Sequence, residues 1–175
     1  MAKPAPASSI VEPGSAFTEL QPLSVEMSEM ELALIVLINA FYRWVDHCGT
    51  SAGVDDLSTM DLLVLHFILY RKRAMTVSEL AFALSIQEIH LVTYSAKKLS
   101  RLGMLKGRRT GKEVSYQPTK ISEAQYSRYL DVRRAHLIRT VGNNPNIAQA
   151  LNSLTDKFNA LSAIYDQASR SIASI

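Results

Sequence analysis

The order of helix, turn, helix, glycine and hairpin signals in the middle of the chain constrains its fold more than any other feature. Two capping boxes lie nine residues apart, Thr76-x-x-Glu79 and Ser85-x-x-Glu88. In each box a hydroxyl and a Glu can satisfy orphan backbone donors at the start of a helix. Two such boxes so close together indicate a helix-turn-helix. The predicted elements are a short helix over residues 77–84 and a longer one over residues 86–102.

A short hairpin is predicted directly after the second helix. Gly103 ends that helix, and residues 104–108 and 113–117 are expected to form two strands joined by a turn. Gly111 can take the positive φ that such a turn demands. The predicted fold class is therefore mainly α with a small β-hairpin wing, a winged helix-turn-helix.

Basic residues are concentrated on the second helix and the hairpin. The window from Ser95 to Lys120 holds eight Lys or Arg residues and one acid, Glu113, whereas the whole chain has a net charge of only +3. A local basic stripe on ordered elements indicates a surface for double-stranded DNA. The cations are Lys97, Lys98, Arg101, Lys106, Arg108, Arg109, Lys112 and Lys120.

Long helices are predicted on both sides of this region. One runs from Ser24 to about Cys48, and its centre over residues 32–38 is apolar all round, so that a second subunit is its expected cover. Helices over residues 122–139 and 147–172 follow the hairpin, and the last one carries a heptad-like apolar spacing. The predicted domains are a disordered Pro-rich arm (1–23), an N-terminal dimerisation helix (24–56), the winged helix-turn-helix (57–120) and C-terminal dimerisation helices (121–175).

Several classes of protein are not expected. The single cysteine allows no internal disulfide, and the N-terminal region has no apolar run typical of a secretory signal. No apolar stretch is long enough to cross a bilayer, so we expect a cytoplasmic protein without a membrane partner. No nucleophile with its base, phosphate loop or carboxylate pair stands out, so neither an enzyme nor a cofactor is predicted.

The residues of this region resemble the multiple-antibiotic-resistance regulator (MarR) family. The resemblance covers about residues 30–140 and implies a homodimeric winged-helix transcription regulator whose recognition helix enters the major groove and whose wing meets the minor groove. It rests on Leu57-Ser58-x₃-Leu62-x-Val64-Leu65, Thr76-Val77-Ser78-Glu79-Leu80-Ala81-x₂-Leu84, Val92-Thr93 and Leu99-x₃-Gly103-Met104-Leu105.

The chain departs from the family pattern in two places. Tyr94 stands where the family usually has Arg, and the wing lacks the family's Asp-x-Arg or Asp-Arg-Arg motif. Arg109 is the favoured groove-inserting residue. The predicted function is a sequence-specific regulator, a repressor of a pseudo-palindromic operator, acting as a homodimer. The alternative is a winged-helix module that binds protein or RNA without reading an operator.

The predicted DNA-binding residues fall into three groups. Side chains near the start and on the outer face of the second helix can reach base edges, cations further along it suit phosphates, and the hairpin tip supplies the wing contacts. In that order the groups are Gln87, His90, Leu91 and Tyr94; Lys97, Lys98 and Arg101; and Arg108, Arg109 and Lys112.

Three groups of residues could have a function beyond packing: a redox sensor, a metal site or an effector cavity. Cys48 beside His47 could sense oxidants, but an inert buried thiol is preferred. Asp46-His47-Cys48 with His66 forms a poor ligand set, because neighbours on a helix diverge, and no metal is predicted. The family implies a small-molecule effector; Phe41, Tyr42, Trp44 and the pair Phe67 and Tyr70 could line its cavity, although core packing explains them equally well.

Overall fold

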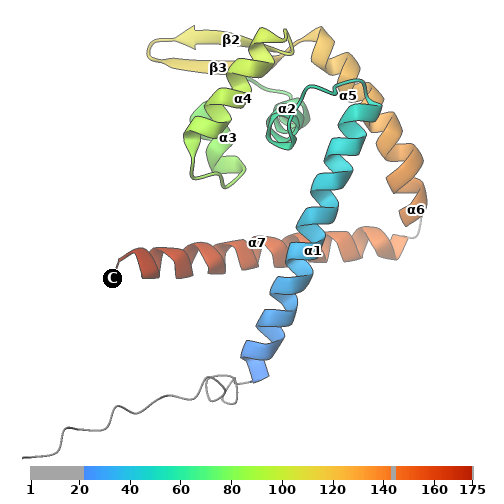
Figure 1. Cartoon of the computed structure of the whole chain (residues 1–175), viewed down its shortest axis with the longest axis vertical. Coiled ribbons are helices and arrows are strands. Elements are labelled where there is room, and N and C mark those ends of the chain that lie inside the picture. The colour runs from blue at the N-terminus through green and yellow to red at the C-terminus, as the bar shows by residue number, and fades with distance from the viewer. Residues whose placement is uncertain (1–21, 143–144, 175) are drawn as a thin grey trace, which may run out of the picture. The chain divides into compact units, whose positions relative to one another are not determined.

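The computed structural model describes residues 22–142 and 145–174 (Figure 1). The predicted disordered arm over residues 1–23 lies almost entirely outside this described part. The chain divides into two compact units, residues 1–47 and 48–175. In the first unit a single helix is described, the N-terminal part of α1 (Pro22–Ser51). Its apolar centre is largely exposed, with Leu32, Ile35 and Val36 each more than half accessible.

Helix α2 (Thr59–Arg71) contributes several buried residues to the core of the second unit. Ser58 caps it in a closed capping box: the Ser58 Oγ accepts from the Asp61 backbone N–H, and the Asp61 carboxylate accepts from the Ser58 N–H. Leu62, Val64 and Ile68 are almost fully buried, so the helix is a central element rather than a surface one. It contacts α4, α5 and strand β3.

Helix α3 (Val77–Ala83) begins at the predicted capping box. The Thr76 Oγ1 accepts from the Glu79 N–H at 3.2 Å, and the Glu79 carboxylate accepts from the Thr76 N–H at 2.7 Å. Met75 and Thr76 also form a two-residue strand, β1, which the sequence analysis missed.

The second predicted capping box does not form. Helix α4 runs from Ile89 to Arg101, three residues later than predicted, and its N-cap Glu88 makes no side-chain cap. Ser85 instead ends α3, with φ of +51° and hydrogen bonds from the Ser85 and Ile86 N–H groups to the Phe82 and Ala81 carbonyls. This is the Schellman arrangement, and it needs a left-handed residue where an N-cap needs an extended one.

The predicted hairpin forms, with each strand one residue longer and the first strand shifted toward the turn. Strands β2 (Leu105–Thr110) and β3 (Glu113–Pro118) pair antiparallel, and β1 adds to the other edge of β3, giving the order β1-β3-β2. Gly111 occupies the turn with φ of +62°. Leu105 and Tyr116 are buried at the base of the hairpin, so the tip extends away from an anchored root (Figure 1).

The helices after the sheet depart from the prediction in one respect. Helix α5 (Lys120–Arg133) passes into a π-helical turn, η2 (Arg134–Ile138), and then into α6 (Arg139–Val141), so the predicted helix over 122–139 is not one regular α-helix. Gly142, with φ of +80°, ends α6. Helix α7 spans Pro145–Ala173. None of the helices within the described ranges combines the length and hydropathy needed to span a membrane.

Candidate nucleic-acid interface

Helix α4 has one face inside the protein and one outside. Val92, Ala96 and Leu99 are inaccessible to solvent and pack toward α2 and α3. Ile89 and Leu102 continue the same apolar spacing, but about half of each is exposed. Both lie at the ends of the helix, beyond the turns that the core covers.

The outer face carries most of the predicted DNA-binding residues of this helix. His90, Tyr94, Lys97 and Arg101 follow a spacing of four, three and four, which places them in one row. All four are exposed, and Leu91 lies beside the row at 40% exposure. The row is therefore a continuous surface of polar, aromatic and cationic groups.

Gln87 and Glu88 precede the helix rather than belonging to its first turn. Both are exposed, and the Glu88 carboxylate lies 3.4 Å from His90 Nε2. Glu88 was predicted as part of a capping box and not as a surface residue of the interface. Since its carboxylate is not used in a cap, it can accept a hydrogen bond at the surface, as from the cytosine N4 amino group in the major groove.

Lys98, predicted as a phosphate contact, lies against the segment that precedes and begins α2. Its Nζ lies 2.7 Å from Asp61 Oδ2 and donates to the Asp56 carbonyl at 2.7 Å, while its side chain is only 24% exposed. The ammonium is thus directed into the junction between α4 and α2. Lys97, its neighbour, remains exposed on the outer row.

The hairpin divides its cations between two faces. Arg109 pairs across the strands with Val114 and shares a face with the buried Tyr116, whereas Arg108 lies opposite Ser115 on the other face with Lys106. The Arg109 Nε donates to the Gly111 carbonyl at 3.2 Å, which holds its guanidinium near the tip. Lys106 was counted in the basic stripe but not among the predicted contacts, although period-two alternation places it beside Arg108.

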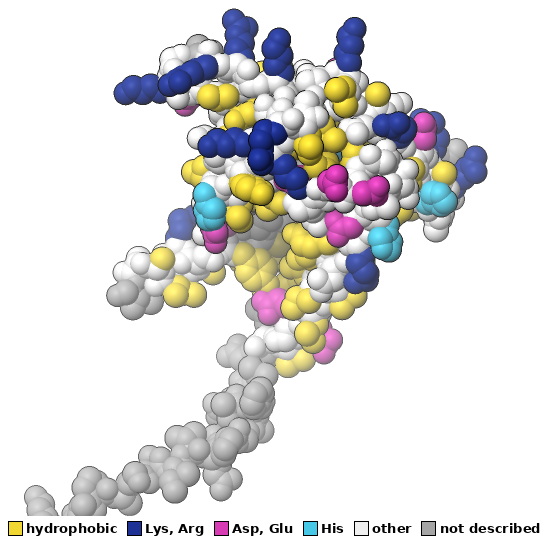
Figure 2. Space-filling view, turned by 45° about the horizontal axis from the view of Figure 1, so that its top comes forward, with side chains coloured by type: hydrophobic (Ala, Val, Ile, Leu, Met, Phe, Trp, Pro, Cys, Tyr) yellow, Lys and Arg dark blue, Asp and Glu magenta, His cyan; other side chains and the backbone are white. Residues whose placement is uncertain are grey.

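Several Lys and Arg side chains project from the hairpin end of the second unit. Figure 2 shows them in the upper part of the molecule, with a few acidic side chains beside and below them. The hairpin cations Lys106, Arg108, Arg109 and Lys112 are all exposed. Such a surface can neutralise the phosphates of a duplex and release their counterions.

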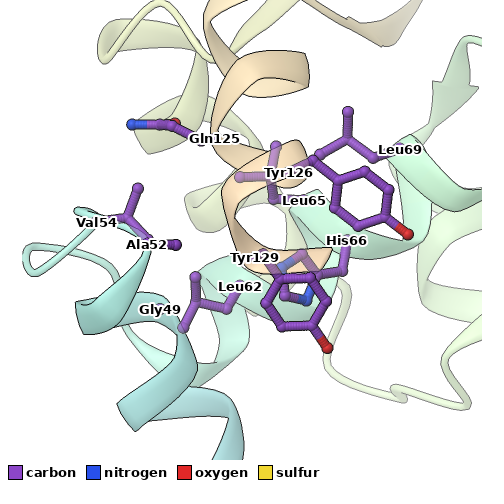
Figure 3. A pocket seen from close by; sticks show the side chains of 10 residues that line it. All are labelled: Gly49, Ala52, Val54, Leu62, Leu65, His66, Leu69, Gln125, Tyr126 and Tyr129. Atoms are coloured by element: carbon purple, nitrogen blue, oxygen red, sulfur yellow. The ribbon is translucent and has the colours of Figure 1, made fainter. Parts of the chain in front are cut away.

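A small apolar pocket lies beneath α5, between α2 and the end of α1 (Figure 3). The His66 ring lies 4.0 Å from the Tyr129 ring, and Tyr126 stacks on Tyr129. Burial lowers the pKa of His66 to about 4, so the imidazole is neutral at pH 7. The free volume of about 10 Å³ holds no more than a single water molecule.

Packing accounts for the surroundings of Phe67, Tyr70 and Cys48, the residues considered for an effector cavity and a redox sensor. Phe67 and Tyr70 contact the Arg71 guanidinium, at 5.1 and 5.9 Å from the ring centroids. Cys48 is buried, and burial raises the pKa of its thiol, which opposes formation of the reactive thiolate. Within residues 22–142 and 145–174, no group of three metal-ligating side chains comes together.

Comparison with known proteins identifies the domain. Residues 57–121 match the family model described as a winged helix DNA-binding domain. No curated protein matches the chain in sequence.

Solved structures share its architecture at low identity. A MarR transcriptional regulator from Methanosarcina mazei Go1 has a TM-score of 0.64 at 14% identity, covering 77% of this chain and 90% of its own. FabT from Streptococcus pneumoniae, solved in complex with DNA, has a TM-score of 0.61 at 17% identity, covering 79% and 99%. A MarR family protein from Bacillus stearothermophilus has a TM-score of 0.62 at 14% identity, covering 78% and 96%.

These matches confirm the predicted fold class. They also confirm that the chain shares the fold of the family that its sequence resembles. The matched segment begins at Leu57 and ends at Ile121, so it contains α2 to α4 and the whole hairpin. Residues 57–121 form a winged helix DNA-binding domain, in a chain with the fold of the MarR-family regulators.

Proposed function

We propose that the protein is a homodimeric transcription regulator that binds a pseudo-palindromic operator through α4 and the hairpin. The observation that carries this proposal is the row His90, Tyr94, Lys97 and Arg101, exposed on a helix whose opposite face is buried. Recognition of duplex DNA requires both a buried face, which holds the helix rigidly, and an exposed face, which enters the major groove. The DNA complex of FabT, a protein of the same fold, supports the proposal.

The chemistry of the side chains assigns their roles. Gln87, two residues before the helix, suits adenine, and Tyr94 can contact a thymine methyl group or a phosphate. Leu91 suits an apolar contact with thymine, and His90 can bond a base edge. Lys97 and Arg101 lie further along the helix and suit phosphates.

The wing would contact the neighbouring minor groove. Arg109 is the candidate for insertion, because its hydrogen bond to the Gly111 carbonyl orients the guanidinium at the tip. Arg108 and Lys112 would meet the flanking phosphates. Binding of such a dimer near a promoter would repress transcription by occlusion.

Dimerisation would use the exposed apolar faces of the terminal helices. Leu32, Ile35 and Val36 on α1 and Leu151 and Phe158 on α7 are each more than two-fifths accessible. Monomeric soluble proteins rarely expose apolar side chains in such continuous rows, which is typical of association surfaces. A second copy would place two recognition helices on a two-fold axis. A small-molecule effector remains part of the family expectation.

Selection from randomised duplex DNA tests the function. The purified protein would be incubated with the library at about 150 mM salt, where purely electrostatic binding is already weak, and the retained DNA sequenced. We expect an inverted repeat whose half-sites lie about 10 base pairs apart. Retention without any motif would indicate an architectural DNA binder. No retention would favour the alternative module that binds protein or RNA.

A further inference from the structure

Lys98 is distinguished from the other cations of α4 by what it contacts. Its Nζ lies 2.7 Å from Asp61 Oδ2 and 2.7 Å from the Asp56 carbonyl oxygen. Both acceptors precede or begin α2, far from Lys98 in the sequence. Two short contacts from one ammonium direct it away from the exposed row.

The environment of the Asp61 carboxylate favours an ion pair with the Lys98 ammonium. Its side chain is 1% exposed, and its Oδ2 also accepts from the Ser58 N–H at 2.9 Å. Burial opposes ionisation of the carboxyl, but the hydrogen bonds from Lys98 and Ser58 outweigh it and keep the pKa of Asp61 below its usual value. The carboxylate is therefore ionised at neutral pH and fixed by the capping box of α2.

Most of the remaining contact between α4 and the core is apolar, and buried Ser95 gives Asp61 a further hydrogen bond. Val92, Ala96 and Leu99 exclude water, but burial of apolar surface is non-directional and tolerates rotation or sliding of the helix. A charged hydrogen bond has a fixed geometry, and buried ion pairs can confer conformational specificity even where they add little stability. Lys98 lies three residues before the end of α4, so it fixes the C-terminal half of the helix.

We propose that the Asp61–Lys98 ion pair orients the recognition helix, and that Lys98 is a positioning residue and not a phosphate contact. The inference rests on the proposed DNA-binding function and refines it. Each protomer then presents Lys97 and Arg101, but not Lys98, to the phosphates from this helix.

Salt dependence separates the two roles. Removal of a cation that neutralises a phosphate lowers the slope of log K against log salt by about 0.9, whereas removal of a positioning residue leaves the slope unchanged. Lys97→Met is the matched control, since it removes the same charge from the adjacent exposed position. We expect Lys97→Met to lower the slope, and Lys98→Met to keep it while reducing the ratio of operator to non-operator affinity by about tenfold or more.

Asp61→Asn provides a test of opposite sign. This change removes a negative charge near the DNA-binding face, so simple electrostatics predicts tighter binding. We expect weaker operator binding instead, with the specificity ratio lowered as in Lys98→Met. The double variant should lose no more than the worse single variant, because both changes break one ion pair. A reduced slope in Lys98→Met with the specificity ratio intact, or tighter operator binding by Asp61→Asn, would overturn the inference.

Amide hydrogen exchange supplies a readout that needs no DNA. Lys98→Met should accelerate exchange in the last turns of α4, and Lys97→Met should not. Equal protection in both variants would contradict the positioning role even in a chain that binds no DNA. Failure of the wild-type protein to retain DNA would overturn the proposed function alone. Lys98→Arg keeps the charge and should recover part of the protection, which guards against a variant that merely fails to fold.

Discussion

Helices α4 and α7 are both amphipathic, but they expose opposite faces. In α4 the apolar residues Val92 and Leu99 are fully buried and the exposed row is polar and cationic, whereas in α7 the apolar residues Leu154 and Phe158 are themselves exposed. The winged helix domain thus completes its own core within one chain. The terminal helix presents a surface suited to another apolar surface, and in the proposed dimer folding and assembly would depend on different parts of the molecule.

Truncating the buried face of α4 should give the largest effect. Leu99→Ala removes a side chain with no solvent access and should lower the free energy of unfolding by about 2–5 kcal/mol. Leu102→Ala, at the C-cap of the same helix and 45% exposed, should cost less than about 1 kcal/mol. Urea unfolding of both variants measures the difference. Equal losses would mean that the core extends to the end of the helix.

Placing a charge on the apolar face of α7 should affect assembly without unfolding the domain. Phe158→Asp removes an aromatic ring from the proposed dimer interface, a loss of about 3 kcal/mol or roughly a hundredfold in the dimer dissociation constant. Ala160→Asp puts the same charge on the opposite side of the helix and should leave the dimer intact. Sedimentation equilibrium distinguishes them. Unchanged association of Phe158→Asp would remove α7 from the interface.

Acid should weaken the core through His66. Its pKa is lowered to about 4 in the folded state, below the ordinary value of about 6.5. The unfolded chain therefore takes up the proton first, so the contribution is complete above pH 6.5 and is lost as pH falls from 6.5 to 4. We expect a loss of up to about 3 kcal/mol over this window in urea titrations. His66→Phe keeps a ring and should flatten this part of the profile, and an unchanged profile would assign it to other groups.

Removing wing cations should give the smallest and most uniform effect. Arg108→Ala with Arg109→Ala should weaken binding to all duplexes and reduce the salt slope by about 0.9 for each phosphate that is no longer neutralised. Arg170→Ala, on α7, should change neither quantity. Fluorescence anisotropy over a salt series measures both. A loss confined to operator DNA would instead give the wing a role in reading sequence.

Local patterns predicted the local parts of this fold. Thr76 and Glu79 are three residues apart, so their capping box follows from short-range geometry, as do the turn at Gly111 and the helix end at Gly103. Ser85 and Glu88 have the same spacing, but their predicted capping box does not form. Ser85 instead adopts the left-handed conformation that ends α3. Competition between two helix ends for one residue is not visible in a motif.

Long-range partners limited the prediction of the site. The charge of Lys98 was evident, but its partner Asp61 lies 37 residues earlier, and only the packing of α2 on α4 brings them together. Glu88 was missed for the converse reason, since a local pattern assigned it a cap that the structure does not use. The roles of the exposed residues toward DNA stay predictions.

The π-helical turn at Arg134–Ile138 has a consequence for how the C-terminal region tolerates change. A π turn accommodates one more residue than an α turn, and each residue of a helix advances the side chains by about 100°. Deleting one residue there would convert the π turn into an α turn and let α5 and α6 merge into a regular helix, so the side chains that follow would keep nearly the same directions. A one-residue deletion within the regular part of α5 would instead rotate every later side chain of that helix by about 100°. The π turn is therefore the place in this helix where the loss of one residue changes the following segment least.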